Sequence, residues 1–153
     1  MRLIVAVVGK PRNAALAAAI AEYETRAARY WPLDVHEVRE ERASGISSTL
    51  VRKREGERLK ERAGSARIIA CDPGGKSLDS DGFARWLQKE RDNDRDAAFV
   101  IGGAYGLSDE ILQAASMKLS LAPWTLPHEL ARLVLAEQLY RAGSIIRGEP
   151  YHK

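Results

Sequence analysis

Apolar residues occur along the chain in short runs that alternate with segments of helical spacing. Five runs predict β-strands, at residues 3–8, 33–38, 67–71, 97–101 and 117–121. The first and fourth runs are apolar almost throughout, which is typical of strands buried on both faces of a sheet. Segments of helical spacing between the runs predict helices that begin near residues 13, 48, 80, 108 and 127. This alternation predicts a single domain over residues 1–153, a three-layer α/β domain with a mainly parallel sheet.

Polar capping residues set the expected helix boundaries. Asn13, Ser80 and Ser108 each precede a segment of helical spacing and are expected as N-caps. Gly64 is expected to end the second helix. Pro127 fits the first turn of the last helix, where its missing N–H is tolerated.

The last predicted helix, residues 127–146, has few polar positions and is dominated by leucine, alanine and valine. A helix that is apolar nearly all round must be buried nearly all round. In a chain of 153 residues, part of that burial is expected to come from a second copy. We therefore predict a homodimer built on this helix, with two-fold symmetry as the default arrangement.

Composition is that of a globular protein, with 45% hydrophobic and 29% charged residues. No apolar run approaches the roughly 20 residues of a membrane-spanning helix, so no membrane association is expected. Cys71 is the only cysteine, which excludes an intrachain disulfide and favours a cytoplasmic location. The sequence has no H-E-x-x-H motif and no acidic cluster with metal-ligand spacing, so we expect no metal.

The net charge is mildly basic, at +3 with an isoelectric point of about 9.1. Nine cationic residues lie between Arg39 and Arg67, with five glutamates interspersed. Two interpretations of this basic stretch remain open. It predicts either a solvated helix with many ion pairs or a surface that faces nucleic-acid phosphates.

Three turns follow predicted strands and are rich in glycine or proline, at residues 72–75, 102–106 and 122–127. Glycines after a buried strand let backbone groups approach a ligand closely. In open parallel sheets, ligands bind beyond the carboxyl ends of the strands. Because all three turns are expected at that edge, they predict one shared pocket, although each taken alone is compatible with an ordinary structural turn.

The glycine pattern does not match the common nucleotide-binding fingerprints. A nicotinamide-binding G-x-G-x-x-G motif is expected after the first strand, where residues 9–12 read Gly-Lys-Pro-Arg. A phosphate loop is also missing, because Ala70 stands where the segment around Gly75 would need its first glycine. A nucleotide-dependent oxidoreductase is therefore disfavoured.

The chain resembles the SPOUT-type methyltransferases that methylate N3 of a pseudouridine in 23S ribosomal RNA. The resemblance runs over the whole chain and is strongest in residues 99–153. Its motifs are Phe99-Val-Ile-Gly-Gly103 with Gly106-Leu107, Leu119-Ser-Leu121, Thr125-Leu-Pro-His128, Arg132, Ala136-Glu-Gln-Leu-Tyr-Arg-Ala142 and Pro150-Tyr-His152. Two positions depart from the family pattern, the pair Ala104-Tyr105 between the glycines and Cys71, where the family commonly has leucine.

The resemblance implies a deep trefoil knot in the C-terminal part, an exception to the rule that folds are unknotted. It also implies that S-adenosylmethionine binds in this knot and that the chain acts on 23S ribosomal RNA in the assembled 70S ribosome. The residues implied to bind the cofactor are Cys71, Gly102, Leu121, Ala122, Pro123, Trp124, Thr125 and Leu126.

Methylation at N3 of a pseudouridine requires loss of the imide proton and alignment of the nitrogen with the methyl group. His152 and Tyr151 are candidates for covering the target base. Arg141 and Arg132 are candidates for stabilising negative charge. Glu137 is expected to orient an arginine or accept the proton, and His128 to shape the nearby loop. Which of these catalytic candidates is the general base stays open.

Three alternatives remain. Glu137 and Arg141 are four residues apart on a predicted helix, so they can also form a simple ion pair. The residues from Tyr151 onward can be a frayed end or, in a dimer, can complete the pocket of the other subunit. The whole chain can also be a non-enzymatic RNA-binding, ribosome-associated module or a SPOUT enzyme that acts on another RNA.

Overall fold

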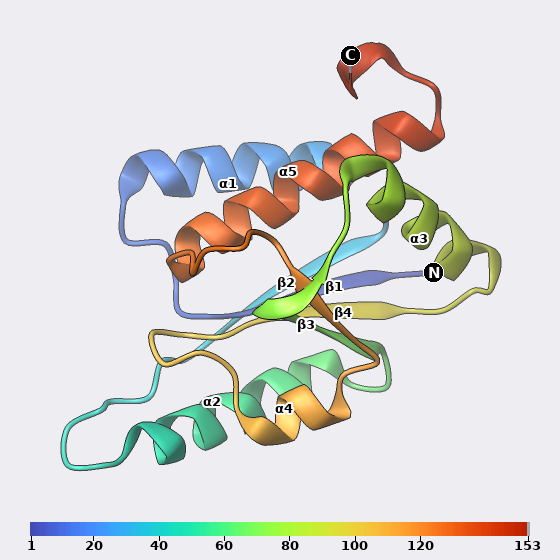
Figure 1. Ribbon diagram of the computed structural model, residues 1–153. Helices are drawn as coiled ribbons and strands as arrows, with labels where there is room; N and C mark the ends of the chain where they lie inside the picture. The colour runs from blue at the N-terminus through green and yellow to red at the C-terminus, as the bar shows by residue number, and fades with distance from the viewer. Residues whose placement is uncertain (153) are drawn as a thin grey trace.

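The computed structural model describes residues 1–152 and shows a five-stranded sheet between two layers of helices (Figure 1). The strands are β1 (Leu3–Val8), β2 (Leu33–Val38), β3 (Arg67–Ser77), β4 (Ala97–Ile101) and β5 (Met117–Ser120). The helices are α1 (Ala14–Ala27), α2 (Ser48–Ala63), α3 (Ser80–Asp92), α4 (Asp109–Ala114), α5 (His128–Ile146) and the 3-10 turn η1 (Pro150–His152). The strand order is β2-β1-β4-β3-β5 and every pairing is parallel. The predicted α/β class with a parallel sheet is therefore confirmed.

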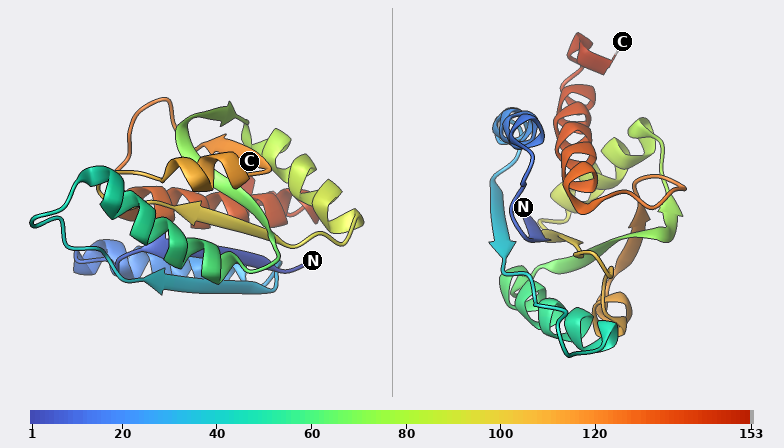
Figure 2. Two further views of the ribbon diagram at one scale, coloured as in Figure 1. Left: turned by 90° about the horizontal axis from the view of Figure 1, so that it is seen from below. Right: turned by 90° about the vertical axis from the view of Figure 1, so that its left-hand side faces the viewer.

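Both faces of the sheet are covered, as the continuous apolar strands predict. Residues of α1, α3 and α5 form one apolar core with alternate residues of β1, such as Leu3 and Val5. Residues of α2 and α4 form a second core with the intervening residues, such as Ile4 and Ala6. Figure 2 shows these two helical layers on opposite sides of the strands. The alternation of strand side chains between the two cores is the period-two geometry of a strand.

Most helix boundaries follow the capping residues expected from the sequence. Asn13 and Ser108 cap α1 and α4 by accepting hydrogen bonds from backbone N–H groups. The predicted N-cap of α3, Ser80, was wrong by one residue. Asp79 is the N-cap, and its side chain accepts a hydrogen bond from Gly82 N. Ser80 begins the helix instead, and its hydroxyl donates to Gln138 Oε1 across 2.8 Å.

Strand β3 differs from the prediction of a strand that ends at Cys71 and is followed by a turn. The strand continues to Ser77, with a register shift between Cys71 and Lys76 where both pair with Leu119 of β5. Gly75 allows this register shift, since a Cβ at that position would lie only 2.6 Å from the carbonyl carbon of Lys118. The segment 72–75 is therefore a bulged part of a strand, which brings the backbones of β3 and β5 unusually close.

Helix α5 packs along α1 and closes one face of the sheet. The Trp31 indole donates to Leu139 O across 2.9 Å, which ties the turn between α1 and β2 to α5. Leu130, Leu133 and Val134 are only partly buried, so the homodimer expected from this helix stays a prediction. The trefoil knot also stays a prediction. Within residues 1–152, no helix is long and apolar enough to cross a membrane.

Candidate functional site

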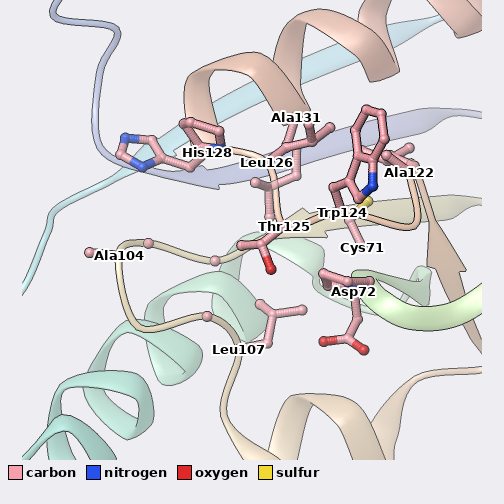
Figure 3. Close-up of a pocket in the computed structure, with 17 residues that line it drawn as sticks. Cys71, Asp72, Ala104, Leu107, Ala122, Trp124, Thr125, Leu126, His128 and Ala131 are labelled. Atoms are coloured by element: carbon pink, nitrogen blue, oxygen red, sulfur yellow. The ribbon is translucent and has the colours of Figure 1, made fainter.

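The carboxyl ends of β3, β4 and β5 bring three segments together around one pocket of about 490 Å³ (Figure 3). The segments are the bulged end of β3, the glycine loop Gly102–Gly106 after β4, and the loop from Leu121 to Pro127 before α5. The pocket is lined by Cys71, Asp72, Pro73, Ile101, Gly102, Gly103, Ala104, Gly106, Leu107, Leu121, Ala122, Trp124, Thr125, Leu126, Pro127, His128 and Ala131. The predicted convergence of three segments at this edge of the sheet is thus observed.

The glycine loop is folded back on itself. Gly103 and Gly106 form an isolated antiparallel bridge, and Gly106 N donates to Gly103 O across 3.0 Å. A Cβ at Gly102 would lie 2.6 Å from the carbonyl carbon of Gly106. Gly106 itself has a φ of 80°. Only glycine allows this close approach and this backbone conformation, so the loop presents bare backbone to the pocket.

The residues implied to bind a cofactor all line the pocket except Pro123. Pro123 is exposed and lies outside the lining. Three lining residues, Ile101, Leu107 and Ala131, lie outside the predicted turns and were not expected at the pocket. All three were apolar positions that looked like ordinary core. Their positions beside the glycine loop and the first turn of α5 are the signals by which they could have been found.

The polar groups in the pocket are few, which is common for cofactor sites. His128 lies in the first turn of α5, and its Nε2 atom is buried without a hydrogen-bond partner among residues 1–152. A buried polar atom without a partner is expensive, so a ligand atom that bonds to it would be favoured. Burial raises the pKa of the Cys71 thiol to about 12, so this group stays uncharged at neutral pH.

Trp124 marks the mouth of the pocket. Its side chain is 77% exposed, the highest value for any large apolar residue in the described chain. In Figure 3, Trp124 and Asp72 lie toward one end of the pocket and His128 toward the other. An exposed tryptophan beside a pocket is more typical of a binding surface than of a solvated loop.

A second group of predicted site residues lies at the middle of α5, where Tyr151 of the tail folds back onto the helix. Glu137 Oε1 accepts from Arg141 Nη2 at 2.7 Å, from Arg141 Nε at 3.0 Å and from the Tyr151 hydroxyl at 3.1 Å. Glu137 Oε2 accepts from Gln138 Nε2 at 2.8 Å. The expected ion pair between Glu137 and Arg141 is therefore confirmed. It also receives Tyr151, which the sequence could not show.

Tyr151 is held by more than this one hydrogen bond. Its ring centroid lies 4.4 Å from that of Tyr140, and the Arg141 guanidinium carbon lies 4.9 Å from the Tyr151 ring. Burial, followed by the hydrogen bonds with Tyr23 and Glu137, raises the pKa of Tyr151 well above its usual range. The phenol therefore stays protonated and acts as a donor. The side chain of His152 lies outside the described part of the structure.

The C-terminal tail, which begins at Pro150, is separate from the pocket of its own chain. Pocket residues His128 and Ala131 lie in the first turns of α5, and Tyr151 follows its other end. Tyr151 folds back onto Glu137, which lies about 14 Å from His128 along the helix axis at 1.5 Å per residue. Figure 1 shows the chain after α5 turning back above the end of that helix. The structure therefore does not bring Tyr151 together with the pocket of the same subunit.

Arg132 lies apart from both groups. It is 7% exposed, and its guanidinium donates to Glu24 of α1 at 2.7 and 3.2 Å and to Glu37 of β2 at 3.2 Å. It is absent from the pocket lining. Arg132 therefore joins α5 to α1 and β2, and any role in charge stabilisation at the target base stays a proposal.

The basic stretch proves to be partly paired. Arg54 and Arg58 of α2 both form ion pairs with Glu41, and Arg67 pairs with Glu90 of α3. The interpretation as an ion-paired helix is confirmed for Arg54 and Arg58, whereas Arg67 forms its ion pair from the start of β3. A phosphate-facing role for the other cations of the stretch stays a prediction.

Comparisons with known proteins agree with this architecture. A family described as "Predicted SPOUT methyltransferase" matches residues 1–152. Ribosomal RNA large subunit methyltransferase H of Gemmatimonas aurantiaca is 60% identical, with 100% of both chains covered. The protein of the same name from Pelobacter propionicus is 44% identical, with 99% of both chains covered. A solved structure of a probable methylase family protein from Haemophilus influenzae is similar in fold, with a TM-score of 0.57 at 13% identity, covering 99% of this chain and 70% of that one.

Proposed function

Because the chain belongs to the SPOUT methyltransferase family, we propose that it methylates ribosomal RNA of the large subunit with S-adenosylmethionine as the methyl donor. The specific target proposed is N3 of a pseudouridine in 23S ribosomal RNA, within the assembled 70S ribosome. The observation that carries the proposal is the pocket at the carboxyl ends of β3, β4 and β5, formed by the segments that the resemblance assigns to the cofactor. The end-to-end match to relatives named ribosomal RNA large subunit methyltransferase H supports the choice of large-subunit ribosomal RNA.

The pocket fits this cofactor in size and chemistry. Its volume of about 490 Å³ lies within the range of small-molecule sites, and its lining is mostly apolar. The bare backbone of the glycine loop suits hydrogen bonding to the edge of an adenine. Leu121, Leu126 and Ala131 are suited to apolar contact with the faces of the adenine ring. S-adenosylmethionine supplies a methyl group that is activated by its positively charged sulfur.

Several groups of the chain would hold and orient this donor. Asp72 provides a carboxylate at the pocket wall, where it favours a positively charged ligand. His128 Nε2 provides a buried polar atom that still needs a partner. Cys71 remains an uncharged thiol and contributes apolar contact. The reaction then depends mainly on alignment of the target nitrogen with the methyl group in a site that excludes water.

The substrate side of the site is proposed to come from a second subunit. Tyr151 is docked on Glu137 in the middle of α5 and does not line the pocket of its own subunit, which favours a contact with the pocket of another copy. The exposed Trp124 and the partly buried Leu130 and Val134 provide apolar surface for such a contact. In a two-fold dimer both subunits would contribute both parts, giving two composite sites.

The residues of the tail and the α5 residues beside it are proposed to have different roles. Glu137 is engaged by Arg141, Gln138 and Tyr151, so it suits an anchor better than a free proton acceptor. Tyr151 is a neutral phenol that can donate to an oxygen of the target base. His152 carries the imidazole of the tail and is the proposed acceptor of the N3 proton. Arg141 would stabilise the imide anion.

Cofactor binding tests the proposal against its main alternative. We expect S-adenosylmethionine to raise the melting temperature of the purified protein and to support methyl transfer to ribosomes. Binding to ribosomal RNA with no thermal shift from S-adenosylmethionine would instead identify a non-enzymatic RNA-binding module.

A further inference from the structure

A buried carboxyl group lies behind the glycine loop of the pocket. Glu55 is in the middle of α2 and is 4% exposed. A Cβ at Gly103 would lie 3.0 Å from Glu55 Oε1 and 3.0 Å from Val8 Cγ1. Gly103 lines the pocket and Glu55 does not. The carboxyl group therefore packs directly against the loop without touching the pocket itself.

The hydrogen bonds of Glu55 are incomplete. Its Oε2 atom accepts from Glu41 N at 3.1 Å, whereas Oε1 is buried and has no partner among residues 1–152. The charged groups that affect it are Glu40 and Glu41 in the loop after β2 and Arg58 on its own helix. Arg58 is itself paired with Glu41. A buried carboxylate with one unsatisfied oxygen is costly, which favours the protonated form.

The next residue of α2 fixes the other end of the same loop. A Cβ at Gly56 would lie 2.5 Å from Ser108 Oγ, so α2 and Ser108 are in close contact. Ser108 follows the loop and caps α4. Glu55 and Gly56 together therefore support both ends of the segment between Gly103 and Ser108, which forms one wall of the pocket.

We propose that Glu55 is a positioning residue for the cofactor, which acts through Gly103 to hold the Gly102–Gly106 loop in the shape that lines the pocket. This inference rests on the proposed function, because it requires the pocket to be the cofactor site. The uncharged acid can lie against the loop without a further partner. The ionised group would need water or another donor at Oε1, and admitting one would displace Gly103.

The contact between the uncharged Glu55 carboxyl group and Gly103 is expected to depend on pH. Desolvation by burial is the main cause that raises the pKa of Glu55 above its usual value. The stabilising contact is therefore complete at low pH and is lost as the pH rises through the raised pKa. Cofactor affinity should weaken in the same direction, apart from any titration of the cofactor itself.

Calorimetric titration of the full-length protein with S-adenosylmethionine, from about pH 4.5, the ordinary pKa of a glutamate, up to about pH 9, tests this inference. Glu55→Gln keeps the shape of the uncharged acid, and its affinity should change less with pH than that of the unmodified protein. Glu55→Ala should weaken affinity about tenfold. The matched control is Glu57→Gln, because Glu57 is exposed on the same helix. At saturating cofactor, Glu55→Ala should recover its turnover number, as expected for a residue that acts on binding.

The outcomes separate the two proposals. If the unmodified protein does not bind S-adenosylmethionine at any pH, the proposed function and this inference both fail. If it binds and the profile of Glu55→Gln coincides with it across the pH range, the positioning role alone is overturned. The comparison does not depend on Glu55→Ala folding, since Glu55→Gln changes one oxygen for a nitrogen and preserves the packing.

Discussion

Tyr151 in the C-terminal tail donates a hydrogen bond to Glu137 Oε1 across 3.1 Å, and so joins the end of the chain to the middle of α5. The same oxygen accepts two hydrogen bonds from Arg141, whose guanidinium lies over the Tyr151 ring. The tail is thus docked within its own subunit, against the middle of α5, and Tyr151 does not line the pocket of that subunit. An ordered tail is expected to present Tyr151 at a fixed position to a neighbouring molecule.

Glu137→Gln tests whether this anchor matters for turnover. The substitution removes the charge that holds Arg141 and weakens the acceptor for Tyr151, so turnover should fall about tenfold or more. Affinity for S-adenosylmethionine should be unchanged, because Glu137 does not line the pocket. Glu110→Gln, at an exposed position of α4, is the control for loss of a carboxylate. Equal turnover of the two variants would remove Glu137 from the site.

Removal of residues 151–153 tests the substrate side of the proposed site independently of the cofactor side. Methyl transfer should be abolished, since Tyr151 and His152 are proposed to contact the target base. Cofactor affinity should persist because the pocket is formed at the other end of α5. Calorimetry and a methyl-transfer assay on ribosomes would measure the two properties. An equal loss of both would contradict the assignment of the tail to the substrate side.

Arg132→Ala should lower the free energy of unfolding and leave the contacts with the cofactor largely unchanged. The substitution leaves Glu24 and Glu37 without the buried guanidinium that pairs with both. Breaking a buried ion pair by removing one partner destabilises a protein by about 3–5 kcal/mol. Chemical denaturation would measure the change. A fully stable Arg132→Ala protein without methyl-transfer activity would instead place Arg132 in the catalytic machinery.

Gly102→Ala should close the pocket from one side. The added Cβ would lie 2.6 Å from the backbone of Gly106, so the loop must shift. Affinity for S-adenosylmethionine should fall by about tenfold or more, since backbone contacts depend on sub-ångström placement. Ala104→Gly removes a side-chain atom from the same loop without a clash and serves as a comparison. Undiminished affinity of Gly102→Ala would show that the loop does not contact the cofactor.

The sequence predicted those parts of the fold in which local pattern and burial agree. The runs 3–8 and 97–101 are apolar throughout and proved to be central strands. The prediction for β3 failed because the glycines at 74 and 75 resemble a turn. Their actual role appears only when the backbone of Lys118 lies against Gly75. Local turn chemistry could not reveal that contact, which joins residues far apart in the chain.

The candidate site, too, could be predicted from the sequence only in part. The pocket could be anticipated because the carboxyl ends of parallel strands meet at one edge. The positions of Arg132 and Tyr151 could not. The partners of Arg132 lie on α1 and β2, and those of Tyr151 on α1 and α5. Glu55 was missed as well, because a glutamate in a charged segment resembles a solvated residue until its burial is known.

Mass mapping of methylated nucleotides in ribosomal RNA tests the central claim most directly. Ribosomes from cells that lack this protein would be incubated with the purified protein and S-adenosylmethionine, and the 23S RNA then digested and sequenced by mass. We predict one additional methyl group at a single pseudouridine, located on N3, that does not appear when the protein is omitted. The absence of any new methyl group on ribosomes, with a protein that is folded and binds S-adenosylmethionine, would contradict the proposed function.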